Sequence, residues 1–222
     1  MIGKFISIEG IDASGKTDIG QKAAERLQEK GYKVIFINKK NLELYSPYIK
    51  KFMSNIKKSL WENKSDDPVD EVKEEEWLYL HTLWYQMMQN HLIVKLLKEN
   101  DFVILDGWYY KFLARHLVNG DFDFDYTYSI LNRLIQCDKV FLIDADPEVC
   151  WSRRKEFKPS EMGKHSEIKS GSEHDRFITY QSNVRDKYLE FSKNYNWNIV
   201  KGNEVDVYVA VDKVVNMILE QK

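Results

Sequence analysis

The stretch KFISIEGIDASGKT, residues 4–17, decides the fold of this 222-residue chain. It begins with apolar residues typical of a buried strand, and residues 18–30, which follow it, favour a helix that ends at Gly31. Between strand and helix lies the pattern GxxxxGK[ST], with its fixed positions at Gly10, Gly15, Lys16 and Thr17. A strand, this loop and a helix in that order predict a loop that holds the phosphates of a nucleotide.

The chemistry of the loop follows from its residue types. Glycines let the backbone curl so that several N–H groups converge on one small volume, and the helix N-terminus adds partial positive charge. Lys16 is predicted to reach the β- and γ-phosphates, and the Thr17 hydroxyl to coordinate Mg²⁺. The residues of the loop predicted to bind nucleotide are Gly10, Asp12, Ala13, Ser14, Gly15, Lys16, Thr17 and Asp18.

Asp12 is an acid inside a loop built for anions, where electrostatics disfavours it unless it serves another ligand. A sugar hydroxyl that donates a hydrogen bond to its carboxylate is the predicted partner.

Further apolar runs predict the rest of an α/β sheet. Residues 32–38 complete a βαβ unit with a right-handed crossover, which implies parallel strands. Two later runs end in Asp106 and Asp144, and a last strand is expected at 197–200. Ligands of open α/β sheets bind outside the carboxyl ends of the strands, so both carboxylates are predicted to lie near the site.

Helical patterns fill most of the remaining chain. Residues 41–100 carry a long helical pattern, and helices are also expected at 146–155, 176–194 and 205–221. Residues 157–175 are polar and weakly patterned, which favours a mobile flap.

Composition excludes several classes of protein. The net charge of −2 gives no global basic field for a nucleic acid polymer, and no apolar run approaches the length that spans a bilayer. The two cysteines, Cys137 and Cys150, are expected to be reduced and packed. We therefore expect a single domain, 1–222, in a cytoplasmic protein with no membrane partner and no signal peptide.

The loop Glu9-Gly10-x-Asp12-x-x-Gly15-Lys16-Thr17 resembles the EGxDGxGKT loop of thymidylate kinases and their relatives among the P-loop nucleoside monophosphate kinases. Asp106 matches the aspartate of the family's DRY or DRH segment, and residues 142–147 resemble its LDVDPE segment. Residues 177–188 resemble its FxxxxxxxRxxY helix. The resemblance implies an α/β P-loop nucleotide kinase fold, with a five-stranded parallel sheet flanked by helices and a lid segment at about 153–176. It also implies a possible homodimer.

The resemblance also implies roles for single residues. Asp12 would hold the 3′-hydroxyl of the acceptor sugar, and Asp106 would organise Mg²⁺ through water. Arg153 and Arg154 lie where the lid begins and would clamp the transferring phosphoryl group and the donor phosphates. Lys201, in the turn after the last strand, would border the donor base. The predicted catalytic residues are thus Lys16, Asp106, Arg153, Arg154 and Asp12.

Further basic residues of the lid are candidates to enter the site when the flap closes, or else ordinary exposed charges. They are Lys155, Lys158, Lys164, Lys169 and Arg176.

The acceptor side departs from the family pattern. The family's Asp-Arg pair is Asp106-Gly107 here, and its SxxAYQ segment is replaced at residues 111–116, where Ala114 alone is kept. Lys111 and Arg115, at i and i+4 on one helical face, either restore positive charge toward an acceptor phosphate or are exposed helix charges. Lys39 and Lys40, at the end of the second strand, are further candidates to meet that phosphate.

The base-binding residues also differ from the family, whose FxxxR stretch is absent as such. Trp84 is predicted either to stack on the acceptor base, with Gln86 at the base edge, or to lie in the core.

The leading interpretation is a Mg²⁺-dependent kinase that moves the γ-phosphoryl group of ATP to a nucleoside monophosphate. Two alternatives stay open. One is a kinase of a hydroxyl on a nucleoside or another small molecule, with an acid such as Glu9 as the base. The other is a nucleotide-binding switch that phosphorylates nothing.

Overall fold

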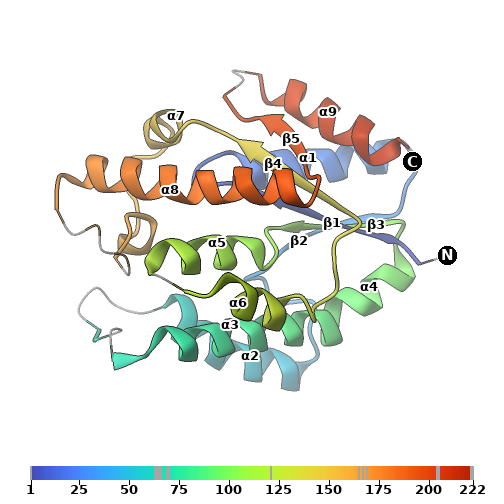
Figure 1. Ribbon diagram of the computed structural model, residues 1–222. Coiled ribbons are helices and arrows are strands. Elements are labelled where there is room, and N and C mark those ends of the chain that lie inside the picture. Colours follow the sequence, from blue (N-terminus) through green and yellow to red (C-terminus); the bar gives the residue numbers. More distant parts are fainter. Residues whose placement is uncertain are drawn as a thin grey trace.

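The computed structural model describes residues 2–62, 67–68, 71–120, 122–164, 166, 168, 170–203 and 206–220. Lys169, a candidate lid residue, lies outside this described part. Five strands form one parallel sheet in the order β2-β3-β1-β4-β5 (Figure 1). They are β1 (Lys4–Glu9), β2 (Val34–Asn38), β3 (Phe102–Asp106), β4 (Lys139–Asp144) and β5 (Asn198–Lys201). This arrangement confirms the predicted fold class.

Side chains of the central strand alternate between two apolar layers, because successive residues of a strand point to opposite faces. Ile6 and Ile8 pack toward α1 (Lys16–Glu29) and α9 (Val207–Leu219), which lie together on one side of the sheet in Figure 1. Phe5 packs on the opposite side with the remaining helices. Ser7 and Glu9, both fully buried, share that second side.

The helices of the second side range from 6 residues in α4 and α7 to 22 residues in α8. They are α2 (Pro47–Trp61), α3 (Glu74–Met88), α4 (Val94–Glu99), α5 (Tyr110–Asn119), α6 (Phe124–Leu131), α7 (Pro147–Ser152) and α8 (Glu173–Asn194). A π-helical turn, η2 (Gln89–Ile93), joins α3 to α4, and a single 3₁₀ turn, η3 (Pro159–Glu161), lies between α7 and α8.

Helix boundaries differ from those predicted, for local reasons. The pattern at 41–100 is divided into α2, α3, η2 and α4 rather than one element. The helix expected to reach residue 155 ends at Ser152. Helix α8 begins three residues before the predicted start, because Ser172 and Asp175 form a capping box in which Ser172 Oγ accepts the Asp175 N–H at 3.1 Å.

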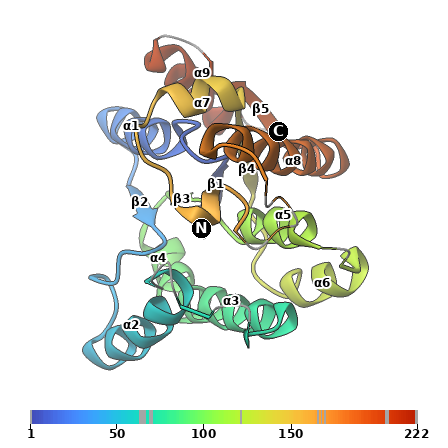
Figure 2. The ribbon, with the colours of Figure 1, turned by 90° about the vertical axis from the view of Figure 1, so that its left-hand side faces the viewer.

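All five strands point the same way, so their carboxyl ends form one edge, which faces the viewer in Figure 2. The loop after β1, the start of α5 and the segment after α7 meet at this edge. Cys150 is buried and Cys137 is half-buried, both are free, and burial raises the pKa of each thiol. No helix in the described ranges is long and apolar enough to cross a membrane.

Candidate active site

The loop between β1 and α1 is shaped to hold an anion. Gly10 has a φ of 152°, and a Cβ there would lie 2.6 Å from Ser14 Oγ and 2.8 Å from the Ile143 carbonyl oxygen. A larger residue would therefore force the loop open. Ser14 Oγ is buried and has no hydrogen-bond partner among the described residues. An unpaired buried hydroxyl at the start of a helix is a donor that a bound phosphate would satisfy.

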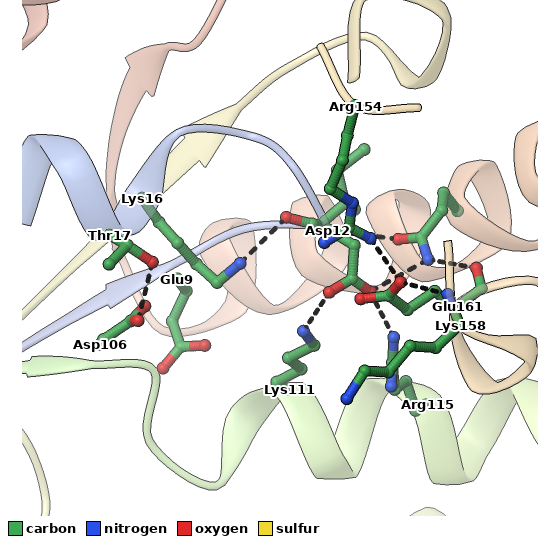
Figure 3. A network of polar contacts seen from close by, with 12 residues as sticks. Glu9, Asp12, Lys16, Thr17, Asp106, Lys111, Arg115, Arg154, Lys158 and Glu161 are labelled. Atoms are coloured by element: carbon green, nitrogen blue, oxygen red, sulfur yellow. Dashed lines mark hydrogen bonds and ion pairs between the residues drawn. The ribbon is translucent and has the colours of Figure 1, made fainter. Parts of the chain in front are cut away.

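Lys16, Thr17 and Asp106 occupy neighbouring positions beside this loop (Figure 3). Lys16 Nζ donates to the Ile11 carbonyl at 3.2 Å, and Thr17 Oγ1 donates to Asp106 Oδ2 at 2.8 Å. The other carboxylate oxygen, Asp106 Oδ1, is buried and unpaired within the described part of the chain. Two adjacent oxygen groups, one of them unsatisfied, suit a hard cation.

The described residues contain no group of three His, Cys, Asp or Glu side chains that would hold a metal ion by itself. Mg²⁺ keeps several waters and uses one or two protein groups together with substrate phosphates, so the donor set of Thr17 and Asp106 fits it.

Asp12 lies at the centre of a polar network. Its members Lys111 and Arg115 were predicted site residues, but their contacts with Asp12 were not predicted. Asp12 Oδ1 accepts from Lys111 Nζ at 2.6 Å, and its Oδ2 accepts from Arg115 and, at 3.1 Å, from Gln181 Nε2 (Figure 3). Burial opposes ionisation of Asp12, but the charges of Arg115, Lys111 and Lys16 outweigh it and hold its pKa well below the usual range. The carboxylate is therefore charged, and both of its oxygens are occupied by the acceptor-side cations.

Burial also changes the basic partners of Asp12. It lowers the pKa of Lys111, although contact with Asp12 opposes the shift. For Arg115 the charge of Asp12 outweighs burial, and the pKa is raised.

Lys39 and Lys40 approach the same region from the end of β2. Lys40 Nζ lies 4.9 Å from the ring centroid of Trp61, and burial followed by the nearby charge of Lys39 lowers its pKa to about 8. Burial also lowers the pKa of Lys39. Gly107, with a φ of 76°, has no side chain, and a Cβ at that position would lie 3.5 Å from Lys39 Nζ. The ammonium of Lys39 thus stands beside the position where the family pattern has an arginine.

One cavity of about 830 Å³ connects the loop to these cations. Its described lining includes nine Lys or Arg residues and four Asp or Glu residues, so it is strongly basic although the chain carries a net charge of −2. The basic residues are Lys16, Lys39, Lys40, Lys111, Arg115, Arg153, Arg154, Lys158 and Lys164. An aromatic wall made of Trp61, His81, Tyr85 and Phe112 closes one part of it. Such a lining suits a ligand that is both polyanionic and aromatic.

The segment after α7 brings two arginines over the loop. Arg153 donates to the Ala13 carbonyl at 3.1 Å and to the Gly202 carbonyl at 2.5 Å, while Arg154 forms an ion pair with Glu161 of η3. Lys158 and Lys164 line the cavity, whereas Lys155 and Arg176 do not. A second hollow of about 270 Å³ lies behind the loop, and Lys201, Asp18 and Val207 are among its lining residues.

Comparison with known proteins gives a consistent result. The family described as thymidylate kinase matches residues 8–213. The chain belongs to the thymidylate kinase family. Among curated relatives, the probable thymidylate kinase of Sulfurisphaera tokodaii is 27% identical over 198 residues, which cover 89% of this chain and 86% of the relative. Probable thymidylate kinase 1 of Saccharolobus solfataricus is 28% identical, with 90% and 89% covered, and the probable thymidylate kinase of Archaeoglobus fulgidus is 30% identical, with 72% and 74% covered.

Membership of the thymidylate kinase family confirms the family that the loop residues predicted, and with it the enzyme class, an ATP-dependent nucleotide kinase. The roles of single residues stay predictions.

Within this member of the thymidylate kinase family, the structure corrects the expected aromatic contact. Trp84 is fully buried and packs its ring edge-on against Trp61 at 4.9 Å, so it lies in the core and does not line the cavity. Gln86 donates to Asn90 and is also away from the cavity wall. The residues of α3 that do reach the wall are His81, three positions before Trp84, and Tyr85, the position after it.

Two further acids are committed to structural contacts. Glu9 is fully buried, does not line the cavity, and accepts from Ser7 Oγ at 2.5 Å and from the Trp108 N–H at 2.6 Å. Burial raises its pKa. Asp144, predicted to lie near the site, accepts two hydrogen bonds from Arg185 of α8 at 2.6 and 3.0 Å and does not line the cavity.

Gln181 is a site residue that sequence reasoning missed. It is fully buried, accepts the Asp12 N–H at 3.2 Å, and donates both to Asp12 Oδ2 and, at 2.7 Å, to the Glu161 carbonyl. A polar residue among the apolar positions of α8 was the available signal.

Proposed function

We propose that the protein transfers the γ-phosphoryl group of ATP, with Mg²⁺, to the phosphate of a nucleoside monophosphate, and that thymidylate is the first acceptor to test. The observation that carries the proposal is the cavity in which the phosphate loop and four acceptor-side cations face the same space. Those cations are Lys39, Lys40, Lys111 and Arg115.

The donor half of this proposal rests on the loop. The buried Ser14 hydroxyl, the N-terminus of α1 and Lys16 would hold the phosphates of ATP, and the hollow beside Lys201 would take its base. Arg153 and Arg154 lie at the cavity rim, where they would neutralise charge on the transferring group. Thr17 and Asp106 would hold Mg²⁺. The bound ion would neutralise developing charge on the donor phosphates.

The acceptor half of the proposal rests on the cavity, in which the basic side chains and the aromatic side chains line different parts. The acceptor phosphate would lie among the lysines and Arg115, and the base against the aromatic wall of Trp61, His81, Tyr85 and Phe112. In this arrangement an oxygen of the acceptor phosphate forms the new bond to the γ-phosphorus, the bond to the β-phosphate oxygen breaks, and ADP leaves. A phosphate oxygen needs no strong base, so catalysis is positioning and charge neutralisation.

Glu9 bears on the alternative in which a hydroxyl is the acceptor. A base must come within hydrogen-bond reach of the proton it removes. Glu9 is fully buried and its carboxylate is already bonded to Ser7 and Trp108, which disfavours that role. The concentration of lysines on the acceptor side also favours an acceptor that already carries a phosphate.

A homodimer remains a proposal about partners. Tyr79 and Leu83 of α3 and Tyr126 of α6 are exposed, and the two tyrosine hydroxyls lie 2.7 Å apart. Sedimentation equilibrium of the purified chain would test it, since a mass of one chain would contradict a dimer.

The test of function is an assay of phosphoryl transfer from ATP and Mg²⁺ to a panel of nucleosides and nucleoside monophosphates. We expect a diphosphate product from at least one monophosphate, and a loss of about 10²–10³-fold in kcat for Lys16→Ala. Lys30→Ala, at the far end of the same helix, is the matched control and should leave kcat unchanged. Phosphorylation of nucleosides alone would contradict the proposal.

A further inference from the structure

His81 is the polar member of the aromatic wall. It lies on α3, lines the cavity, and stacks on Phe112 with ring centroids 4.1 Å apart and planes inclined by 17°. The Trp61 ring meets it edge-on at 6.0 Å. These contacts on two sides restrict the orientation of the imidazole, so its ring nitrogens have defined directions.

The hydrogen bonds of His81 determine where its proton sits. Nδ1 lies 2.9 Å from the carbonyl oxygen of Trp77, one turn earlier in the same helix. A carbonyl oxygen only accepts, so Nδ1 carries the hydrogen. Burial lowers the pKa of His81 to about 3, and the ring is therefore neutral near pH 7. In a neutral imidazole with the proton on Nδ1, Nε2 is an acceptor and never a donor.

Nε2 is open to a ligand. The two ring nitrogens point away from each other, and Nδ1 faces the backbone of α3, so Nε2 faces away from that helix. Throughout the described ranges, the contacts of His81 leave Nε2 without a hydrogen bond, and it is not among the buried unpaired atoms. Its neighbours in the wall, Trp61 and Phe112, offer carbon surface and the Trp61 N–H donor, so His81 adds an acceptor there.

We propose that His81 is a specificity-determining residue, and that its Nε2 accepts a hydrogen bond from an imino or amino N–H on the edge of the acceptor base. This inference rests on the proposed function. It assigns the acceptor to the bases that present such a donor toward α3, and it disfavours a base that presents a carbonyl oxygen there, because two acceptors would then be left facing each other.

The first test removes the donor from the substrate and keeps both ring carbonyl oxygens. Thymidylate carries an imino N–H at ring position 3, and N3-methylthymidine monophosphate has a methyl group in place of that hydrogen. If the imino group is the donor, the wild-type protein should show a kcat/KM about 10-fold higher for thymidylate, mainly through KM. If another base is preferred in the panel, the same comparison uses that monophosphate and its analogue in which the N–H facing α3 is methylated.

The second test removes the acceptor from the protein. His81→Phe keeps an aromatic ring against Phe112, and we expect the 10-fold preference, measured as the ratio of kcat/KM for the two substrates, to fall to about 1-fold. His91→Phe, an exposed histidine of η2, is the matched control and should keep the full preference.

The outcomes separate this inference from the proposed function. Equal kcat/KM values for the two substrates with the wild-type protein, or an unchanged preference in His81→Phe, would overturn the role of His81 while the kinase stands. A wild-type protein that phosphorylates no monophosphate would overturn the proposed function itself.

Discussion

At the scale of residues, Asp12 is the centre of the site. In the family resemblance an aspartate at this position holds a sugar hydroxyl, yet here its two oxygens accept from Lys111 and Arg115. Both cations lie in the segment that departs from the family's SxxAYQ pattern. We propose that Asp12 orients these two groups, which would replace the missing arginine, and that a sugar hydroxyl would share its carboxylate with them.

The charge of Asp12 should matter for stability. Asp12→Asn leaves Lys111 and Arg115 without their counter-charge, and about a fifth of each cation's side chain is exposed (18% and 20%), so the cost should fall below that of a fully buried pair. We expect a loss of about 2–3 kcal/mol in the free energy of unfolding, measured by urea denaturation. The control Asp18→Asn removes an exposed partner of Lys22 and should change the free energy of unfolding by less than about 0.5 kcal/mol. Equal losses in the two variants would contradict the role of the network.

Lys40 should give acceptor binding a dependence on pH. Its pKa of about 8 means that its positive charge is present below pH 8 and is lost as the pH rises through that value. KM for the acceptor monophosphate should therefore rise between pH 7 and 9. Arginine keeps its charge over this range, so Lys40→Arg should show a smaller rise. The pKa of Lys39 is also lowered, so Lys39 can contribute to the rise as well. The quantity to compare is therefore the difference between the KM–pH profiles of the wild-type protein and Lys40→Arg. Identical profiles would contradict a role of Lys40 in acceptor binding.

The variant Gly107→Arg tests whether Lys39 takes the place of the arginine that the family pattern has at position 107. With a φ of 76°, any other residue there is strained, so Gly107→Arg should lose about 1–2 kcal/mol of stability. We also expect no rise in kcat/KM for the acceptor, because Lys39 Nζ already lies 3.5 Å from where the Cβ of the new residue would be. Gly31→Ala, with a φ of 90° and open space around it, should carry a similar strain and leave kcat/KM unchanged. A Gly107→Arg enzyme with improved kcat/KM would show that the position needs its arginine.

At the scale of elements, α8 joins the phosphate loop to η3, which lies in the segment that we expect to act as a lid. Gln181 bonds to Asp12 in the loop and to the Glu161 carbonyl of η3, while Arg185 on the next turn holds the end of β4 through Asp144. Arg153 and Arg154 extend from the segment between α7 and η3. Arg154 forms an ion pair with Glu161, whose carbonyl is held by Gln181, so the position of Arg154 depends on α8.

Gln181→Leu should loosen this connection. The change removes the donor to the Glu161 carbonyl and leaves the Asp12 N–H unpaired, which should cost about 1–3 kcal/mol. Hydrogen exchange of the amides in residues 160–164 should become faster relative to the sheet. Gln136→Leu, which loses a bond to Tyr109 far from the lid, is the control and should leave those amides unchanged. Unchanged protection in both variants would show that Gln181 does not hold the lid.

At the scale of the whole molecule, the features that could be predicted are those marked by a contiguous stretch of sequence. The phosphate loop and the strands that end in Asp106 and Asp144 are contiguous patterns, and each gave its element directly. The Asp12–Arg115 contact joins residues 103 positions apart, and no periodicity reports such a pair. Trp84 and His81 share α3, yet Trp84 is fully buried against Trp61 of α2 while His81 lines the cavity, and this difference depends on packing between helices. The predicted start of α8 was wrong, because capping by Ser172 extends the helix into a segment whose polar composition predicts a flap.

The central claim is that the acceptor already carries a phosphate. The most direct measurement is ³¹P NMR of the protein with ATP, Mg²⁺ and an equimolar mixture of thymidine and thymidylate. We expect the thymidylate resonance to fall while the resonances of nucleoside diphosphates grow. A thymidylate resonance that grows as ATP is consumed, the result of phosphorylating thymidine, would contradict the claim.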